Sequence, residues 1–302
     1  MTLGKSKRKK IKTNNSKKRS RTIKKMNCNP GVKGNTASTN TCYTNIHLLK
    51  IRNAYNKKNP TKTIKSNLPN NIIKKLRSNL QCGQEDCWLN QLSEQERKII
   101  DNKVFAPDHP SSWKKNPTEW LSNYDILNVL KQYENTFKDF KFIGPTPIDF
   151  ASMENGDCIW PELCNIQLNH FISKKINKIG IIFNLDKHDE SGSHWVSMFI
   201  NIKEGIVFYF DSAANETPPE INNLIQIILK QATTISIPMK YLTNYPKQHQ
   251  QSNTECGMYS LYFIITMIDK TKSMEKKIDI FQKQTVTDKR MKSFRKKYFN
   301  SK

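Results

Sequence analysis

The sequence predicts a mixed α+β fold in which a sheet is flanked by helices. Three short apolar segments with strand character follow one another at residues 178–185 (KIGIIFNL), 195–202 (WVSMFINI) and 205–211 (GIVFYFD). Residues 219–231 are apolar on a helical period. Residues 256–268 are almost continuously apolar and long enough for a buried helix. This succession of strands, a helix and a second helix indicates one α+β (mixed α/β) domain.

Further elements are expected around these segments. The Lys203-Glu204-Gly205 connection suits a tight antiparallel hairpin between the second and third strands. Ser93 and Glu96 stand at capping-box spacing before a helix at 92–102, and Ser122 or Asn123 can cap another. The remaining candidates are helices at 69–80 and 168–175, short strands or loops at 141–144 and 147–150, and a strand at 233–241.

The net charge of +24 is unevenly distributed. Residues 1–84 hold 22 Lys and Arg and no Asp or Glu, whereas residues 85–288 hold 21 basic and 26 acidic residues, a net of −5. Residues 289–302 add seven basic residues and no acidic one. Polar, basic segments bury too little apolar area to offset chain entropy. We therefore predict three regions: a basic, largely disordered extension at 1–80, the globular domain at 81–270, and a basic, partly helical tail at 271–302.

The cysteines and the hydropathy of the chain indicate in which cellular compartment the protein is expected. Seven cysteines without a secretory signal argue against a disulfide framework and favour reduced thiols. The Cys82/Cys87 and Cys158/Cys164 spacings differ from those of common zinc knuckles, so small buried thiols are expected rather than a metal site. No apolar run approaches the roughly 18 residues that a membrane span needs. We expect a soluble intracellular or particle-enclosed monomer without a membrane partner.

Two polar residues stand at the ends of neighbouring predicted strands. His194 lies where a Gly-Ser loop enters the second strand, and Asp211 ends the very apolar third strand. Alone, such a His more often only bonds its neighbourhood, and an Asp-Ser pair more often starts a turn. If the two strands pair antiparallel, however, the side chains meet, and Asp211 can orient the imidazole of His194 and stabilise its protonated form.

Cys256 stands where a polar segment changes abruptly into the last apolar helix. The positive end of the helix dipole and a nearby imidazolium both lower the pKa of a thiol at such a position. A buried structural cysteine would have apolar neighbours on both sides, whereas the preceding residues are polar. Gln248, Gln250 and Gln251 are amide donors shortly upstream, and any of them could line an oxyanion hole with the Cys256 N–H.

The chain order of these residues resembles that of the cysteine proteases that include the SUMO-type ubiquitin-like proteases and the adenovirus endopeptidase, adenain. His194 and Trp195 match the His-Trp pair of that family, and Asp211, followed by Ser212, matches its strand-end acid. The segment 120–126 (WLSNYDI) resembles the family's Trp-Leu-Asn-Asp-x-x-Ile motif. Papain-like enzymes run Cys, His, Asn along the chain, so the order here argues against them.

The nucleophile motif carries the rest of the resemblance. Gln250 stands six residues before Cys256, the spacing of the oxyanion glutamine in SUMO-type members, and Cys256-Gly257 matches the nucleophile and its glycine. Glu255 replaces the Asp that is usual before the Cys. Two segments, 120–134 (WLSNYDILNVLKQYE) and 142–150 (FIGPTPIDF), are most similar to adenain-like thiol proteases of nucleocytoplasmic large DNA viruses.

The resemblance implies a fold and a mechanism. The fold would be that of adenain and the SUMO proteases, with the nucleophile at the N-terminus of a central helix in a protease domain at 81–270. Cys256, His194 and Asp211 would be catalytic, Gln250 would line the oxyanion hole, and Trp195 would cover the substrate's last residues. The family needs no metal or cofactor, favours small residues, often Gly-Gly, before the cut, and in adenain-like members is helped by DNA. DNA or a peptide is therefore considered as an activator.

Three functions compete on the sequence. The first is an endopeptidase that cleaves capsid or core precursors during virion maturation, located in the virion and, before packaging, in the host cytoplasm or viral factory. The second removes SUMO or ubiquitin-like modifiers through the same site. The third, from another class, is a non-enzymatic nucleic-acid-binding virion protein, in which the triad pattern is accidental. The basic ends leave two interpretations open. They could be solvated, disordered arms that serve as a localisation signal, or arms that bind DNA or RNA, because uncompensated Lys and Arg bind phosphates without sequence preference.

Overall fold

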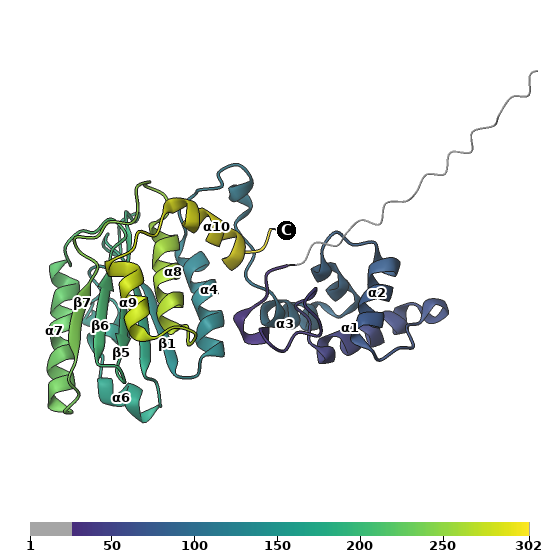
Figure 1. The fold of residues 1–302 in the computed structure, drawn as a ribbon, viewed down its shortest axis with the longest axis horizontal. Helices are drawn as coiled ribbons and strands as arrows, with labels where there is room; N and C mark the ends of the chain where they lie inside the picture. The colour runs from purple at the N-terminus through teal and green to yellow at the C-terminus, as the bar shows by residue number, and fades with distance from the viewer. Residues whose placement is uncertain (1–25, 302) are drawn as a thin grey trace, which may run out of the picture.

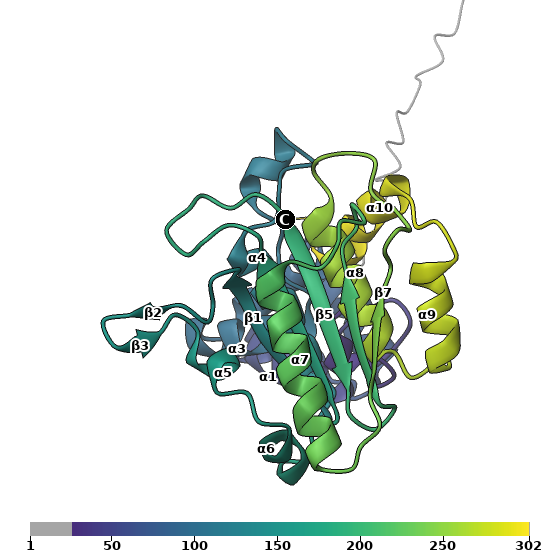
Figure 2. The same cartoon turned by 90° about the vertical axis from the view of Figure 1, so that its left-hand side faces the viewer.

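The computed structural model describes residues 26–301 and confirms a mixed sheet flanked by helices (Figures 1 and 2). The five strands of the sheet lie in the order β1-β4-β5-β6-β7. Their bounds are Phe140–Pro147 (β1), Lys178–Asn184 (β4), Trp195–Asn201 (β5), Ile206–Phe210 (β6) and Lys240–Thr243 (β7). The two outer pairs, β1–β4 and β6–β7, are parallel, and the inner pairs, β4–β5 and β5–β6, are antiparallel. A separate small hairpin pairs β2 (Met153–Glu154) with β3 (Asp157–Cys158).

Helices cover both faces of the sheet. One face packs against α8, α4 and α9, with α10 packed against α8, and α7 crosses the other face, nearest the viewer in Figure 2. Along the fully buried β5, Trp195 and Phe199 join the core on the α8 side, whereas Val196, Met198 and Ile200 join the core on the α7 side. This alternation explains why the central strands are apolar throughout. The helices here are α4 (Asn123–Thr136), α5 (Pro161–Cys164), α6 (Leu168–Ser173), α7 (Pro219–Thr234), α8 (Cys256–Ile268), α9 (Met274–Gln282) and α10 (Asp288–Tyr298).

The predicted elements lie close to the observed ones where the signal was local. The three strands and the hairpin agree within two residues, the helix at 69–80 is confirmed, and Ser122 is the N-cap of α4 in a capping box with Asp125. The strand predicted at 233–241 is wrong over most of its length. The preceding helix α7 continues to Thr234, and β7 begins only at Lys240.

Residues 26–80 differ from the predicted disordered extension. They fold with residues 81–105 into a helical unit beside the sheet, on the right in Figure 1. Apolar residues of α1, such as Leu48 and Ile51, pack there with Trp88 and Phe105, which follow the predicted extension. The apolar side chains of residues 26–80 are therefore buried only because residues 81–105 complete the same hydrophobic core. Its helices are α1 (Asn45–Lys58), α2 (Pro69–Leu80) and α3 (Glu94–Val104), with 3₁₀ turns η1 (Pro30–Val32), η2 (Pro60–Lys62) and η3 (Glu85–Gln91), and η4 (Ser111–Lys114) follows.

Two further predictions concern the ends of the chain, namely disorder at the N-terminal end and partial helix at the C-terminal end. Residues 1–25, which hold the densest basic run, lie outside the described residues, so the prediction of disorder there stays a prediction. The tail at 271–302 was expected to be helical in part, and it contains α9 and α10, which pack against α8. Within residues 26–301, no helix combines the length and the apolarity that crossing a bilayer would require.

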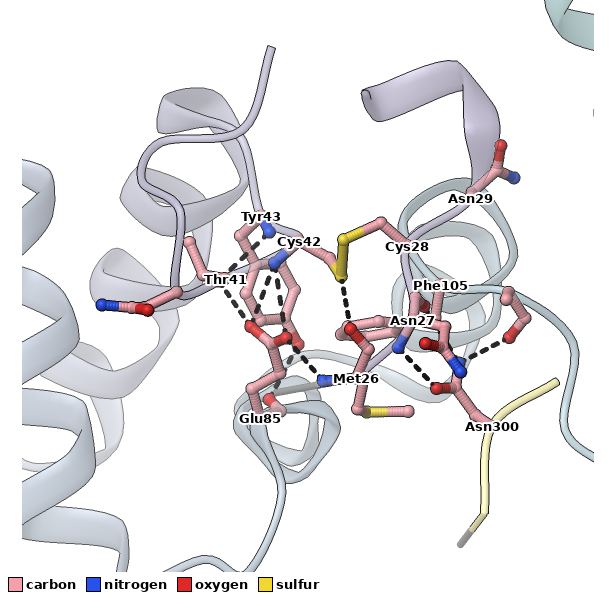
Figure 3. The surroundings of a disulfide bond; sticks show 12 residues. Met26, Asn27, Cys28, Asn29, Thr41, Cys42, Tyr43, Glu85, Phe105 and Asn300 are labelled. Atoms are coloured by element: carbon pink, nitrogen blue, oxygen red, sulfur yellow. Dashed lines mark hydrogen bonds between the residues drawn. A yellow bond between two sulfur atoms is a disulfide. The ribbon is translucent and has the colours of Figure 1, made fainter. Parts of the chain in front are cut away.

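The cysteines contradict the expectation of reduced thiols. All seven lie within the described residues, and six are paired as Cys28–Cys42, Cys82–Cys87 and Cys158–Cys164. Their Cα–Cα separations of 5.2, 6.1 and 6.6 Å lie in the range that a disulfide can bridge. Figure 3 shows Cys28–Cys42 beside the buried carboxylate of Glu85, which accepts bonds from Thr41 and Cys42. The paired cysteines are 14, 5 and 6 residues apart in the chain, so the spacing allowed these pairs, and the expectation failed because it rested on the lack of a secretory signal. Cys256 is the one cysteine left free.

Candidate active site

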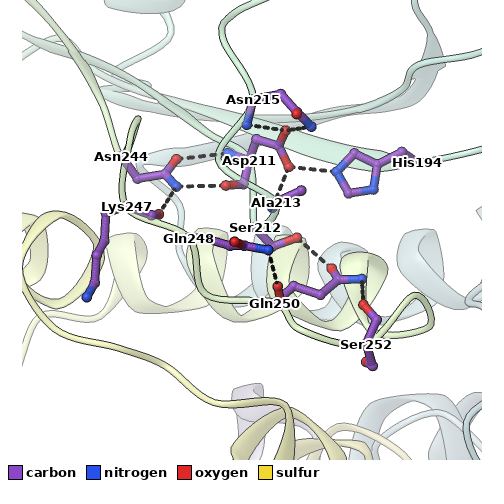
Figure 4. A network of polar contacts seen from close by, with 10 residues as sticks. All are labelled: His194, Asp211, Ser212, Ala213, Asn215, Asn244, Lys247, Gln248, Gln250 and Ser252. Atoms are coloured by element: carbon purple, nitrogen blue, oxygen red, sulfur yellow. Dashed lines mark hydrogen bonds and ion pairs between the residues drawn. The ribbon is translucent and has the colours of Figure 1, made fainter.

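Strand pairing brings His194 and Asp211 together. His194 directly precedes β5, Asp211 directly follows β6, and these antiparallel strands pair with Ser197 opposite Phe210. The entrance of one strand therefore lies beside the exit of the other. The His194 Nε2 atom lies 2.6 Å from Asp211 Oδ1 (Figure 4). The predicted His–Asp contact across the sheet is present.

The Asp211 carboxylate is buried but fully bonded. The backbone N–H of Ala213 donates to Oδ1 at 2.8 Å, and the backbone and side-chain N–H groups of Asn215 donate to Oδ2 at 3.1 and 2.9 Å. Burial by itself raises the pKa of the carboxyl, but the bonds and charge of His194 and the donors of Ala213 and Asn215 outweigh it, so the pKa lies below its ordinary value. Asp211 is therefore an ionised partner for His194.

Asn244 fixes the backbone on which Asp211 sits. It follows β7, the parallel neighbour of β6, and its side chain is 2% exposed. Its Oδ1 accepts from Asp211 N–H at 3.0 Å, and its Nδ2 donates to the Asp211 carbonyl at 2.7 Å and to the Lys247 carbonyl at 2.8 Å. One amide thus ties the end of β6 to the polypeptide that leads toward Gln250.

Cys256 begins α8 and is 2% exposed. Residues at a helix N-terminus lie beside backbone N–H groups without intrahelical partners, which can donate hydrogen bonds to a group held there. The next residue, Gly257, packs on Leu121, because a Cβ at Gly257 would lie 3.0 Å from the Leu121 Cβ. Leu121, which precedes α4, therefore packs directly against the first turn of α8, where Cys256 lies.

The electrostatics of His194 connect it to both other residues. Burial lowers the pKa of its imidazole, but hydrogen bonds and charge interactions with Asp211 and Cys256 outweigh burial and raise the pKa to about 10. Since Nε2 is occupied by Asp211, Nδ1 is the ring nitrogen left for Cys256. An imidazole that holds its proton at neutral pH is the partner that a thiolate requires.

Among the three candidate glutamines, Gln250 is favoured by its position. It is 6% exposed, whereas Gln248 and Gln251 are exposed. The Ser212 hydroxyl, next to Asp211, donates to Gln250 Oε1 at 2.7 Å, and Gln250 Nε2 donates to the Ser252 carbonyl. These bonds fix the orientation of the amide and leave one of its two N–H groups for another acceptor.

Trp195 lies beside this site as a packed residue. It is 5% exposed, and its indole N–H donates to the Leu121 carbonyl at 3.0 Å. The His-Trp motif is thereby joined to the 120–126 motif, while the neighbouring Trp120 remains 43% exposed. A contact of Trp195 with substrate stays a prediction. Among the described residues, no group of three or more His, Cys, Asp or Glu side chains is arranged to hold a metal ion.

Sequence reasoning missed the residues that orient the others. Asn215 and Asn244 bond to the side chain and the backbone of Asp211, and Ser212 bonds to Gln250. An Asn four residues after the strand-end acid is a local signal that could have identified Asn215. Asn244 gives no such signal, because its role depends on the parallel pairing of β7 with β6.

The arrangement can support acyl transfer through a thiol. Cys256 could supply a nucleophile, and His194 could act as a proton carrier oriented by a carboxylate. Gln250 and the backbone N–H groups at the start of α8 are donors that a developing oxyanion could use. No single one of these features is specific. Their combination in one place at the end of a sheet is typical of cysteine peptidases.

Comparisons with known proteins agree with this chemistry. A protein named "Putative thiol protease R355" from Acanthamoeba polyphaga mimivirus is 32% identical over 253 residues, which cover 76% of this chain and 80% of that protein. Cysteine protease S273R of African swine fever virus is 25% identical over 257 residues, covering 79% of this chain and 90% of that protein.

The fold is also shared with a solved structure. The crystal structure of the pS273R protease of African swine fever virus superposes with a TM-score of 0.64 at 19% identity, covering 91% of this chain and 96% of that one. Residues 124–302 match the model of the Ulp1 protease family, C-terminal catalytic domain. The chain therefore belongs to the Ulp1 protease family and is a cysteine protease.

Proposed function

We propose that Cys256 is the nucleophile of an endopeptidase, that His194 is its acid–base partner, that Asp211 orients His194, and that Gln250 stabilises the oxyanion. The observation that carries the proposal is the contact between His194, at the start of β5, and Asp211, at the end of β6. Cys256 is the first residue of the adjacent helix α8. The raised pKa of His194 supports it, since the imidazolium and a Cys256 thiolate stabilise one another.

The proposed reaction has two halves. The Cys256 thiolate attacks the scissile carbonyl, and the oxyanion that forms is held by Gln250 and backbone N–H groups. The imidazolium of His194 then gives its proton to the leaving amine, so that a thioester and a free N-terminus result. In the second half, neutral His194 takes a proton from water, whose hydroxyl group displaces Cys256 and releases the new carboxylate.

For the substrate we propose viral capsid or core precursor proteins, cut after Gly-Gly-type sites during virion maturation. The similarity to proteins of two large DNA viruses supports a viral setting. The protein would act in the virion, and before packaging it would reside in the host cytoplasm or viral factory. Removal of SUMO-like modifiers is the second candidate, because the family model is that of a Ulp1 protease and several S273R proteins are named SUMO-1 cysteine proteases.

The test is cleavage by the wild-type chain and by Cys256→Ala. Wild type should cut a Gly-Gly-x precursor peptide, whereas Cys256→Ala should cut none while keeping the wild-type circular dichroism spectrum. Cleavage by the variant would refute the proposed nucleophile. A SUMO-type or ubiquitin-type active-site probe, tested in parallel, separates the substrates: labelling by the probe without cutting of the peptide would favour deconjugation.

We also propose that the basic ends bind nucleic acid. Residues 1–84 carry 22 Lys and Arg and no acidic residue, which would give sequence-independent affinity that falls steeply with salt. Binding of unrelated DNA duplexes should be equal at a given salt concentration and should weaken at least tenfold when residues 1–25 are deleted. Unchanged affinity in the truncated chain would exclude these residues as the binding segment.

A further inference from the structure

The segment between Gln250 and Cys256 is held by residues from the C-terminal end of the chain. Asp288, the first residue of α10, accepts the backbone N–H of Ser252 at 2.8 Å and that of Gln251 at 3.2 Å. Its other oxygen accepts the hydroxyl of Tyr259, a fully buried residue of α8, at 2.9 Å. One carboxylate therefore connects the loop that follows Gln250 with the helix that begins at Cys256.

A second residue of α10 holds the other end of the same segment. Arg295 is 5% exposed, and its Nε donates to Glu255 Oε2 at 2.9 Å, while its Nη2 donates to the Thr254 carbonyl at 3.3 Å. Glu255 is fully buried and directly precedes Cys256. The guanidinium also stacks on Trp113, with its carbon 4.5 Å from the ring centroid. These contacts fix Arg295 from two sides.

A buried histidine anchors the start of the segment. The Nδ1 atom of His249 accepts the Val286 N–H at 3.1 Å, which assigns the proton to Nε2, and Nε2 lies 2.8 Å from the Phe281 carbonyl. His249 is 1% exposed, and burial lowers the pKa of its imidazole. Residues before, inside and after the segment thus all contact the stretch 281–295.

We propose that α10 positions the oxyanion hole, with Asp288 and Arg295 as positioning residues for Gln250 and the Cys256 N–H. Asp288 and Arg295 are seven residues apart on one helix, about two turns or ~10 Å, so the helix fixes the spacing between residues 252 and 255. The inference rests on the proposed function, because it assigns a role in the same reaction. It gives the basic tail a second use: Arg295 faces inward, while Lys292, Lys296 and Lys297 stay exposed.

The experiment compares Asp288→Asn and Arg295→Lys with Ser293→Ala, a control on the same helix whose exposed side chain bonds only within α10. Cleavage of a Gly-Gly-aminomethylcoumarin peptide gives kcat and KM. Alkylation of Cys256 by iodoacetamide gives the reactivity of the thiolate, because the other six cysteines are paired. Alkylation forms no oxyanion, so it depends on the His194–Cys256 pair and not on the oxyanion donors.

Both α10 variants should lower kcat about 10- to 100-fold, less than the loss of a whole oxyanion donor, with KM changed less than about twofold. Their alkylation rates and the kinetics of Ser293→Ala should equal those of wild type. The inference is overturned if folded Asp288→Asn and Arg295→Lys keep wild-type kcat, or if kcat and alkylation fall together, which would indicate general loosening. Such outcomes leave the proposed function intact as long as cleavage requires Cys256, whereas absence of Cys256-dependent cleavage in wild type overturns both.

Discussion

At the residue scale, the site is a chain of polar contacts that runs from Asn215 through Asp211 and His194 to Cys256. The Asp211 carboxylate accepts four hydrogen bonds in a fully buried position. Two of its acceptor positions are taken by Asn215, so the carboxylate cannot rotate away from His194 without breaking other bonds. Asp211 therefore acts on both the geometry and the protonation of the imidazole.

Replacement of Asp211 by Asn should move the pH dependence of cleavage. The pKa of His194 is about 10 in the folded enzyme, against an ordinary value of 6.5, so wild-type kcat/KM should persist above neutral pH and fall as the imidazolium loses its proton near that pKa. Without the carboxylate, this basic limb should shift toward neutral pH. We expect kcat to drop by about 10²- to 10⁴-fold. A profile from pH 5 to pH 10.5 measures both.

The same substitution has a consequence for stability. A folded-state pKa above the unfolded value stabilises the fold fully below pH 6.5, and this stabilisation is lost as the pH rises through about 10. The unfolding free energy of wild type should therefore decrease over that interval, and the decrease should be smaller in Asp211→Asn. Identical basic limbs and identical stability slopes in the two proteins would contradict the role given to Asp211.

At the scale of elements, the site depends on how α8 packs against the residues that precede α4. Leu121 contacts Gly257 in the first turn of α8, and its carbonyl accepts the Trp195 indole at the start of β5. Leu121 therefore brings three sequence motifs into contact: the segment 120–126, the His194-Trp195 pair and the Cys256-Gly257 pair. Cys256 is held in place by its neighbour in the chain as well as by its polar partners.

Gly257→Ala should test this packing. A Gly to Ala change inside a helix usually stabilises by up to about 1 kcal/mol, but here the added Cβ lies 3.0 Å from Leu121 Cβ and 3.2 Å from its Cγ and Cδ1. Overpacking of this kind costs about 1–3 kcal/mol. We expect a net loss of stability in urea unfolding and slower cleavage.

Two controls make the Gly257→Ala result specific. In a Leu121→Ala background two of the three close contacts disappear, so the penalty of Gly257→Ala should shrink. Gly83→Ala, where a Cβ would meet nothing within 4 Å, should be tolerated. A stabilised Gly257→Ala variant would show that Leu121 yields freely and that the first turn of α8 is not constrained by it.

The elements show what the sequence could and could not predict. The strands that carry His194 and Asp211 and the N-terminus of α8 were predictable because apolar period, turn chemistry and helix caps are local properties. The β7 strand was misplaced because the apolar run after α7 fits a helix end or a strand equally well. The contacts of Asn244 with Asp211 and of α10 with the Gln250–Cys256 segment join residues that are more than 30 positions apart in the chain, which no local pattern records. The disulfides join cysteines only 5 to 14 residues apart, and they were missed because the lack of a secretory signal favoured reduced thiols.

At the scale of the whole molecule, the two described ends of the chain lie side by side. The Asn300 side chain accepts the Asn27 N–H at 2.7 Å (Figure 3) and donates to the Asn27 carbonyl at 3.1 Å. It also donates to the Ala106 carbonyl at 2.9 Å, and the Asn27 side chain donates to the Lys296 and Phe299 carbonyls. The end of α10 is thus joined to the helical unit. This junction connects that unit with the helix that contacts the Gln250–Cys256 segment.

Asn300→Ala should weaken this junction. Asn300 is 3% exposed, and its removal leaves the Asn27 N–H without its acceptor, which costs about 1–3 kcal/mol. We expect a lower urea midpoint and faster hydrogen exchange at Asn27 and in the last turn of α10. Asn135→Ala, at an exposed position of α4, is the control and should not destabilise the protein. Unchanged exchange in Asn300→Ala would mean that other contacts hold the two ends.

Trapping the acyl-enzyme tests directly whether Cys256 is the nucleophile. Wild-type protein is mixed with a Gly-Gly peptide ester, quenched in acid within the first turnovers and mapped by mass spectrometry. The proposed mechanism predicts the mass of the acyl peptide as a thioester on the fragment that contains Cys256, and its absence in Cys256→Ala. Turnover of the ester with no acyl adduct on Cys256, or with the adduct on another residue, would contradict it.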